Sequence, residues 1–124
     1  MEILRSVLRE LPEFQQLLAA LDGGQSPVAV SGLAAVHRAH FAACLGQESG
    51  RPVVMVCADE GEAERMARDL SFLTGGEVPV LAARSFLFHN IATVSRQWEH
   101  RRLRLLYRLT RGEIPCLVAT VEAL

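Results

Sequence analysis

The fold is decided by the stretch Arg51-Pro52-Val53-Val54-Met55-Val56-Cys57-Ala58-Asp59-Glu60-Gly61-Glu62. Residues 53–57 form a continuous hydrophobic run, typical of a strand buried on both faces in the interior of a sheet. Asp59 and Glu62 have the spacing of a capping box, so a helix begins directly after the strand. Apolar residues then repeat at helical spacing until Gly75-Gly76 breaks the pattern. The stretch therefore predicts a strand-helix unit, from which parallel α/β sheets are built.

Strands and helices alternate along the rest of the chain. The patterns predict helices over residues 13–21, 33–45 and 96–111, strands over 28–30, 78–81 and 116–121, and an irregular segment over 82–94. Gly46 and Gly112 are expected to end the second and third of these helices, and Ser95 to cap the third. Right-handed crossovers then favour a mainly parallel sheet with helices on both faces. We expect one three-layer α/β domain over residues 1–124.

The bulk composition excludes several classes of protein. Of the 124 residues, 50% are hydrophobic and 22% are charged, which is ordinary for a compact domain with a core. The net charge of -1 provides no global field that would attract nucleic acid or an anionic membrane. No apolar run approaches the roughly 20 residues that span a bilayer, so we expect a cytoplasmic protein without a membrane partner.

The basic and sulfur-containing residues narrow the chemistry further. All 13 basic residues are arginine, so every mechanism that requires a lysine amine is excluded. Cys44, Cys57 and Cys116 lie far apart in apolar runs, which favours buried free thiols over a disulfide framework or a zinc site. His37, His40 and Cys44 share one helical face, but no fourth ligand lies near them, so we predict no metal site.

A degenerate phosphate loop is the most informative motif. In a parallel α/β sheet, the turn from an early strand into the next helix binds phosphate, because the helix amides and dipole face it. On the pattern Gly-x-x-x-x-Gly-Lys-Ser/Thr, Ala29 and Ala34 replace the two glycines, Ala35 the lysine and Val36 the hydroxyl residue. Gly32 remains inside the turn. The loop therefore lacks the cation that reaches the terminal phosphates and the hydroxyl that ligates magnesium.

Other interpretations of this turn remain open. It can be a strand-helix junction that never bound phosphate, with Gly32 serving only the turn. It can also be an unconventional nucleotide-binding loop at Ser31-Gly32, where free helix amides attract an anion. A serine hydrolase is not indicated, since Ala29 and Leu33 replace the two glycines of the nucleophile-elbow pattern around Ser31. We expect no catalytic residue and no cofactor in this chain.

The chain resembles a known family over nearly its whole length. It is similar to the amino-terminal module of the bacterial transcription-repair coupling factors, itself similar to the first domain of excinuclease B, the B component of excinuclease ABC. The blocks that carry the resemblance are residues 11–18, 28–33, 58–65, 94–103, 111–113 and 118–124, of which the last three are the most specific. No single block is unique to the family, but the order and spacing of the blocks are hard to obtain by chance.

The resemblance implies a fold and a context. The fold would be that of the phosphate-loop triphosphatases and helicases, without a working loop, and the chain would be the first segment of an excinuclease-B-like module. The whole protein would be an ATP-driven DNA translocase that displaces stalled RNA polymerase and recruits excinuclease A, the A component of excinuclease ABC. ATP and magnesium would bind its motor domains, and excinuclease A mainly the domain that follows. We accordingly expect the chain to be a piece of a longer protein.

One helix is a candidate partner surface. The helix predicted over residues 96–111 carries arginines with few acids nearby, and the irregular segment before it carries two phenylalanines. The candidate residues are Arg96, Arg101, Arg102, Arg104, Arg108, Phe86 and Phe88. An arginine face can grip nucleic-acid phosphates, pair with an acidic protein or domain, or only be solvated, and the sequence leaves all three open. Phe86, Phe88 and Trp98 are expected in the core more than as anchors.

Overall fold

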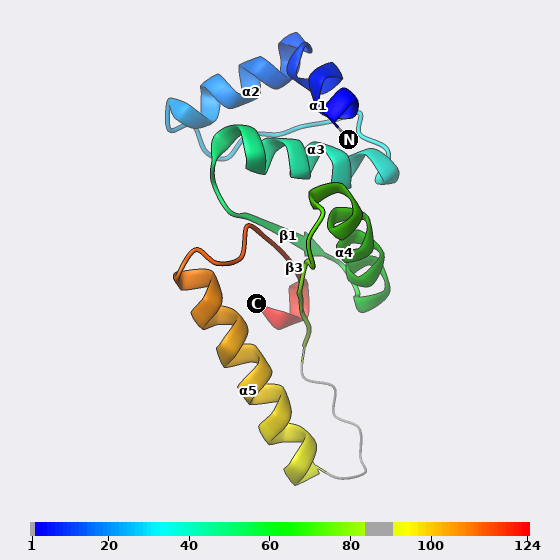
Figure 1. The fold of residues 1–124 in the computed structure, drawn as a ribbon, viewed down its shortest axis with the longest axis vertical. Helices are drawn as coiled ribbons and strands as arrows, with labels where there is room; N and C mark the ends of the chain where they lie inside the picture. Colours follow the sequence, from blue (N-terminus) through cyan, green and yellow to red (C-terminus); the bar gives the residue numbers. More distant parts are fainter. Residues whose placement is uncertain (1, 84–90) are drawn as a thin grey trace.

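The computed structural model describes residues 2–83 and 91–124, and side chains from Ile3 to Ala83 and from Arg96 onward (Figure 1). Helices and strands alternate after an initial helical hairpin. The elements are α1 (Glu2–Arg9), α2 (Pro12–Asp22), α3 (Ala35–Ser49), β1 (Val53–Cys57), α4 (Glu60–Thr74), β2 (Val80–Leu81), α5 (Ile91–Thr110), β3 (Cys116–Thr120) and the 3-10 turn η1 (Val121–Ala123). This order confirms the predicted α/β class.

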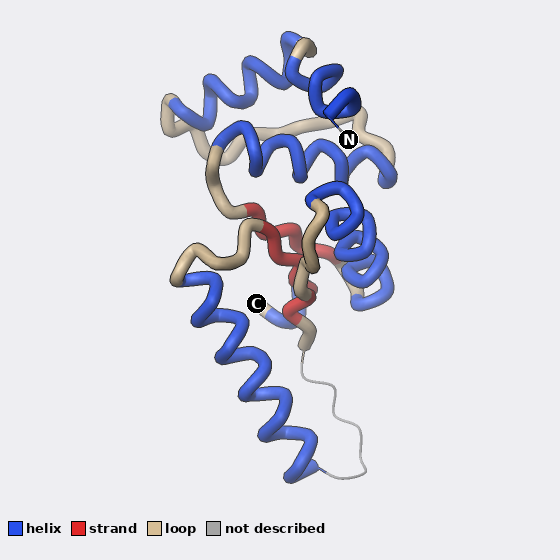
Figure 2. The backbone as a smooth tube through the Cα atoms, in the orientation of Figure 1, coloured by secondary structure: helices blue, strands red, loops and turns tan. Residues whose placement is uncertain are grey.

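The sheet has three strands in the order β1-β3-β2, and both pairs are parallel, as predicted (Figure 2). Every residue of β3 is buried, so β3 is the interior strand. The prediction that residues 53–57 lie in the sheet interior is wrong, because β1 pairs only with β3 among the described residues. Val54 and Val56 are 44% and 49% exposed. Apolar content alone did not separate an edge strand from an interior one.

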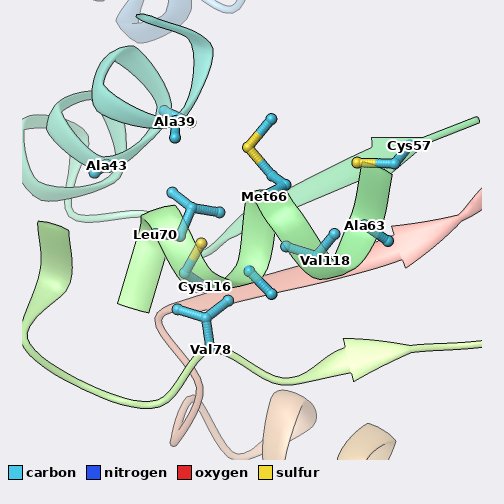
Figure 3. Packing of buried hydrophobic residues seen from close by; sticks show 11 residues of the cluster. Ala39, Ala43, Cys57, Ala63, Met66, Leu70, Val78, Cys116 and Val118 are labelled. Atoms are coloured by element: carbon cyan, nitrogen blue, oxygen red, sulfur yellow. The ribbon is translucent and has the colours of Figure 1, made fainter. Parts of the chain in front are cut away.

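Helices α3 and α4 close one face of the sheet. Ala39, Ala63, Leu70 and Val118 are all 0% exposed in the cluster that joins these helices to β1 and β3 (Figure 3). Helices α3 and α4 contact each other as well as the strands, and Leu70 is one of the largest fully buried side chains of the cluster. This cluster is the main core of the described chain.

Helix α5 covers part of the opposite face. Leu81, Leu117 and Ala119 of the sheet are buried there, and Leu105 and Leu109 of α5 pack against them while remaining partly exposed. Helices therefore lie on both faces, as predicted. The cover stops short of the edge strand, where Val54 and Val56 are exposed on this face.

The predicted capping box at the start of α4 is confirmed. The Asp59 carboxylate accepts a hydrogen bond from the Glu62 amide at 2.8 Å, and the Glu62 carboxylate accepts one from the Ala58 amide at 3.0 Å. Two amides that the helix leaves without intrahelical partners are thereby satisfied. Gly75, in the left-handed conformation with φ 74°, ends the helix. Both signals were readable in the sequence because they are local.

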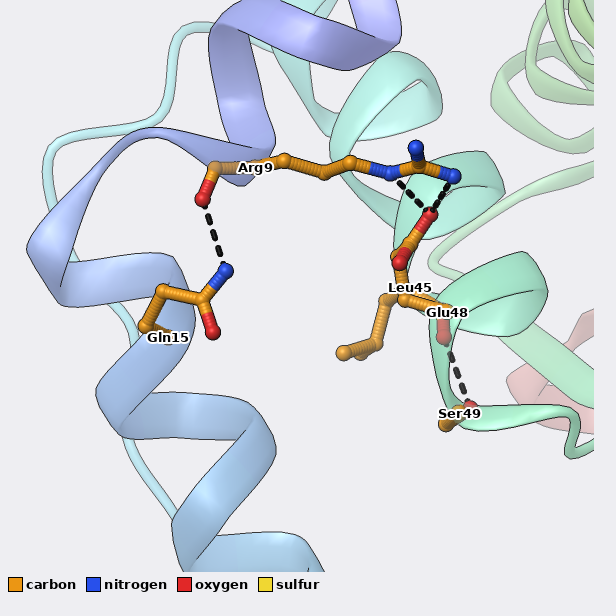
Figure 4. Close-up of polar contacts among 5 residues, drawn as sticks. All are labelled: Arg9, Gln15, Leu45, Glu48 and Ser49. Carbon is orange, nitrogen blue, oxygen red and sulfur yellow. Dashed lines mark hydrogen bonds and ion pairs between the residues drawn. The ribbon is translucent and has the colours of Figure 1, made fainter.

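The helical hairpin α1–α2 lies against α3 (Figures 1 and 4). The Arg9 guanidinium forms an ion pair with the Glu48 carboxylate of α3, and the Gln15 amide donates a hydrogen bond to the Arg9 carbonyl at 2.7 Å. Phe14 packs edge-on against Phe41 of α3, with ring centroids 5.4 Å apart. The helix predicted over 13–21 is confirmed as α2, whereas α1 was not predicted.

Two predictions around α3 are wrong. Residues 28–30 are extended but form no strand, and Val28 and Val30 are 40% and 48% exposed. A three-residue run with exposed side chains buries little apolar surface, and this gain is too small to offset the conformational entropy that the backbone loses when it pairs as a strand. Helix α3 also begins at Ala35 and continues through Gly46 to Ser49. Gly46 serves close packing, since a Cβ there would lie 2.7 Å from Val53 Cγ2; Gly50, at φ 65°, is the helix end.

The remaining boundaries shift by a few residues. Helix α5 begins at Ile91, so Ser95 lies within the helix instead of capping it. Strand β2 is limited to Val80–Leu81, since Pro79 has no amide hydrogen to donate to a ladder. Strand β3 ends at Thr120, and η1 begins at Val121. Part of the segment predicted as irregular, residues 84–90, lies outside the described residues.

Candidate functional site

The turn predicted as a degenerate phosphate loop leads from the extended segment into α3. Gly32 has φ 84°, and Ala34 is the N-cap of α3 without a side-chain capping bond. Ala35 is the first residue of the helix, and Val36, 68% exposed, is the second. The positions that correspond to the lysine and the hydroxyl residue therefore present a methyl and an isopropyl group to solvent. Neither can contact a phosphate or ligate magnesium.

A hollow of about 560 Å³, the turn hollow, lies between this turn and β1. Apolar side chains line most of it, including Phe41, Leu45 and Val53, and Arg38 is the only charged residue in the lining. The Arg38 guanidinium lies 3.9 Å from a Glu62 carboxylate oxygen, a pair that is half exposed. The hollow thus offers one cation, already partnered, and no hydroxyl at the helix start.

The histidine and cysteine side chains on α3 do not assemble. His37 is exposed, His40 is partly buried with its Nε2 atom unpartnered, and Cys44 is buried. No group of three or more potential metal ligands occurs within residues 2–83 and 91–124. The three residues share one face of α3, but they are buried to different extents. Sharing a face therefore did not bring them together as a set of metal ligands.

The three cysteines are free, buried thiols, as predicted. Burial raises the pKa of each thiol above its ordinary value; at Cys44, Glu48 adds to the rise while Arg5 and Arg9 oppose it. A raised pKa disfavours the thiolate, which is the nucleophilic and metal-binding form. These side chains therefore behave as small apolar core residues.

The arginines of α5 separate into groups. Arg101, Arg102, Arg104 and Arg108 line a hollow of about 370 Å³ between α5 and β2, which we call the arginine groove. The hollow is also lined by Trp98, Leu105, Val80 and Leu81, and Glu77 is the only acid among the described residues of the lining. Arg96 is exposed on α5 but does not line the groove. Phe86 and Phe88 lie outside the described residues.

One arginine of the groove is held in place. Arg102 donates a hydrogen bond from Nη2 to the Ala123 carbonyl at 2.8 Å, and its guanidinium lies over the Trp98 ring at 5.5 Å from the centroid. Arg102 is half-buried, unlike its three exposed neighbours. The sequence signal for this arrangement was the i, i+4 spacing of Trp98 and Arg102, but the contact to Ala123 joins residues 21 apart and was not predictable.

Glu113 lies at the other end of α5. Its carboxylate is 3.7 Å from Arg108 Nε and 3.3 Å from Arg111 Nε, and Arg111 also lies over the Tyr107 ring. These groups are about half exposed, so solvent weakens each pair. Arg101 and Arg104 form no ion pair within the described residues. The least compensated positive charges in the arginine groove are therefore those of Arg101 and Arg104.

Known proteins were compared with the whole chain. It is 26% identical over 125 residues to the transcription-repair-coupling factor of Bacillus subtilis (strain 168), a match covering 100% of this chain and 11% of that protein. It is 34% identical over 119 residues to the transcription-repair-coupling factor of Myxococcus xanthus, covering 90% of this chain and 10% of that protein. The chain is related to a module of the transcription-repair-coupling factors.

The similarity to the transcription-repair-coupling factors is not confined to the sheet. Because the Bacillus match covers all of the chain, it includes the α1–α2 hairpin and α5 as well as the core. The chain spans about a tenth of the length of both relatives. No protein-family model and no solved structure matches it. None of the helices in the described residues has the length and apolarity needed to cross a bilayer.

Proposed function

We propose that this chain is a non-catalytic docking and regulatory domain of a transcription-repair coupling factor. It would be the first segment of an excinuclease-B-like module that keeps the architecture of a phosphate-loop triphosphatase or helicase as a scaffold. The observation that carries the proposal is the turn into α3, where Ala35 and Val36 occupy the positions of the phosphate-binding lysine and the magnesium ligand. A parallel sheet beside a helix start that offers no lysine and no hydroxyl suits a scaffold better than a nucleotide-hydrolysing enzyme.

The proposed context follows from the relatives. Both are transcription-repair-coupling factors, and both are about ten times as long as this chain. We propose that the whole protein is a cytoplasmic, ATP-dependent DNA translocase that displaces stalled RNA polymerase in nucleotide excision repair. ATP, magnesium, DNA and RNA polymerase would bind its other domains. Excinuclease A would bind mainly the domain that follows this one.

The incompletely covered sheet face supports contact with other domains. Parallel sheets are normally covered on both faces, yet Val54 and Val56 of β1 are about half exposed beside α5. An apolar strand face of this kind is stabilised when another element packs on it. We propose that further domains of the longer protein do so.

One observation favours an alternative function. The turn hollow lies directly beside Ser31 and Gly32 and contains Arg38, so an anion held by the turn would have a guanidinium near it. The alternative is a nucleotide- or nucleic-acid-binding α/β domain with an unconventional loop. Against it, the lining is mostly apolar and Arg38 already faces Glu62.

Calorimetric titration of the chain with ATP and magnesium tests the proposal. We expect no binding at micromolar nucleotide, because the start of α3 offers no lysine or hydroxyl to the terminal phosphates and Arg38 already faces Glu62. A protein with an intact phosphate loop serves as the positive control. Micromolar affinity that is lost in Arg38→Ala would contradict the proposal and establish the alternative at the turn hollow.

A further inference from the structure

The arginine groove combines a strand edge with a charged helix. Its one wall is β2, which pairs with β3 on one side and with no other strand among the described residues. Its other wall is the middle of α5. Edge strands accept extended peptides, which add main-chain hydrogen bonds to the sheet. The shape of the site therefore suits an extended segment lying beside β2.

The charges of the groove favour an anionic occupant. Arg101, Arg104 and Arg108 are exposed and occur at i, i+3 and i+7, so they point to the same side of α5. At a rise of about 1.5 Å per residue, the row is about 10 Å long. An extended peptide places alternate side chains about 7 Å apart on one side. Two acidic residues at alternate positions can therefore each meet an arginine of the row.

The floor of the groove favours a peptide over a nucleic acid. Val80, Leu81 and Leu105 are aliphatic and offer no hydrogen-bonding group to a base edge. Trp98, the only aromatic residue among the described residues of the lining, already has the Arg102 guanidinium over its ring, which competes with base stacking. The apolar parts of an extended peptide, in contrast, gain from burial on an aliphatic floor.

We propose that the arginine groove binds an extended, acidic segment of a partner protein. Carboxylates at alternate positions of that segment pair with Arg101 and Arg104, while its main chain lies along the open edge of β2 and its intervening side chains point to the opposite side. Arg102 forms one side of the groove in a fixed position, because its side chain is held by the Ala123 carbonyl and the Trp98 ring. This inference rests on the proposed docking function and identifies the surface and the chemistry of its partner.

Fluorescence anisotropy with model peptides tests the inference on the full 124-residue chain. The probe is a short labelled peptide that alternates glutamate with valine, and its control replaces every glutamate with glutamine. The test variant Arg101→Glu/Arg104→Glu reverses the two charges of the row that form no ion pair within the described residues. The matched control Arg65→Glu/Arg68→Glu makes the same change in net charge at two exposed positions of α4. A milder variant, Arg101→Gln/Arg104→Gln, is used if the reversal disturbs the circular dichroism spectrum.

We expect the glutamate peptide to bind more tightly than the glutamine peptide. The reversal should weaken binding about tenfold or more, and the α4 control by about twofold. Equal binding of the two peptides, no binding of either, or equal effects of the two reversals would overturn the inference. So would tighter binding of labelled oligothymidine or duplex DNA that is lost in the same groove variant, which would make the groove a nucleic-acid site. If the peptide test fails and the calorimetric titration shows no ATP binding, the proposal of a non-catalytic domain is retained and only the arginine groove is rejected as its docking surface.

Discussion

The two faces of the sheet differ in how completely helices cover them. On the α3–α4 face, Ala39, Ala63, Leu70 and Val118 have no exposed surface. On the α5 face, Leu105 and Leu109 remain partly exposed and Val56 is 49% exposed. The α3–α4 face therefore accounts for most of the stability that packing on the sheet provides. The α5 face leaves apolar side chains and arginines exposed, where a partner can contact them. We expect mutations to separate the two faces by their cost in unfolding free energy.

The largest effect is expected at Leu70. Leu70→Ala removes a side chain with no exposed surface and leaves a cavity between α4 and the sheet, which should lower the unfolding free energy by about 2–5 kcal/mol. Urea denaturation followed by circular dichroism measures this change. Phe72→Ala on the same helix, where the side chain is 78% exposed, is the control and should cost less than about 0.5 kcal/mol. Similar costs at the two positions would mean that the α3–α4 face is not the main core.

A smaller effect is expected at Gly46, on the same face. Gly46→Ala places a Cβ 2.7 Å from Val53 Cγ2, so α3 must move away from β1. Overpacking costs about 1–3 kcal/mol, and the better helix propensity of alanine returns up to about 1 kcal/mol, which leaves a net loss. Gly76→Ala, where no atom lies within 4 Å of the added Cβ, is the matched control. A Gly46→Ala chain as stable as wild type would show that α3 and β1 are not in contact there.

Sequence patterns predicted the α3–α4 face better than the α5 face. The helix from Glu60, its capping box and its stop at Gly75 depend on residues within a few positions of each other, so they were predictable. The edge position of β1 was not, because residues 53–57 are as hydrophobic as an interior strand and only the order β1-β3-β2 exposes Val54 and Val56. Strand order depends on pairing between distant segments, which periodicity does not report.

The candidate site shows the same division. That Ala35 and Val36 offer no cation and no hydroxyl at the start of α3 was predictable, since residue identity alone decides it. That four of the α5 arginines share a groove with β2 was not, because it depends on how α5 crosses the sheet. The position of Arg102 in that groove depends on its contact with the Trp98 ring and on its hydrogen bond to the distant Ala123 carbonyl. Local chemistry was therefore predictable and its spatial assembly was not.

The smallest effect is expected at Val56 and tests whether the α5 face is open in solution. Val56→Thr keeps the shape and strand propensity of the side chain, and its hydroxyl can reach water because the position is about half exposed. The unfolding free energy should change by less than about 0.5 kcal/mol. Val118→Thr on β3 makes the same change where no surface is exposed and should cost about 1–3 kcal/mol, since the buried hydroxyl loses its water.

This pair of variants also detects a hidden partner for the open face. If Val56→Thr cost as much as Val118→Thr, the face at β1 would be covered in solution, and a second copy of the chain would be the available cover. The cost would then depend on protein concentration, because association stabilises the folded state by mass action. A small cost that is independent of concentration means that Val54 and Val56 are exposed in the isolated chain and free to contact another domain.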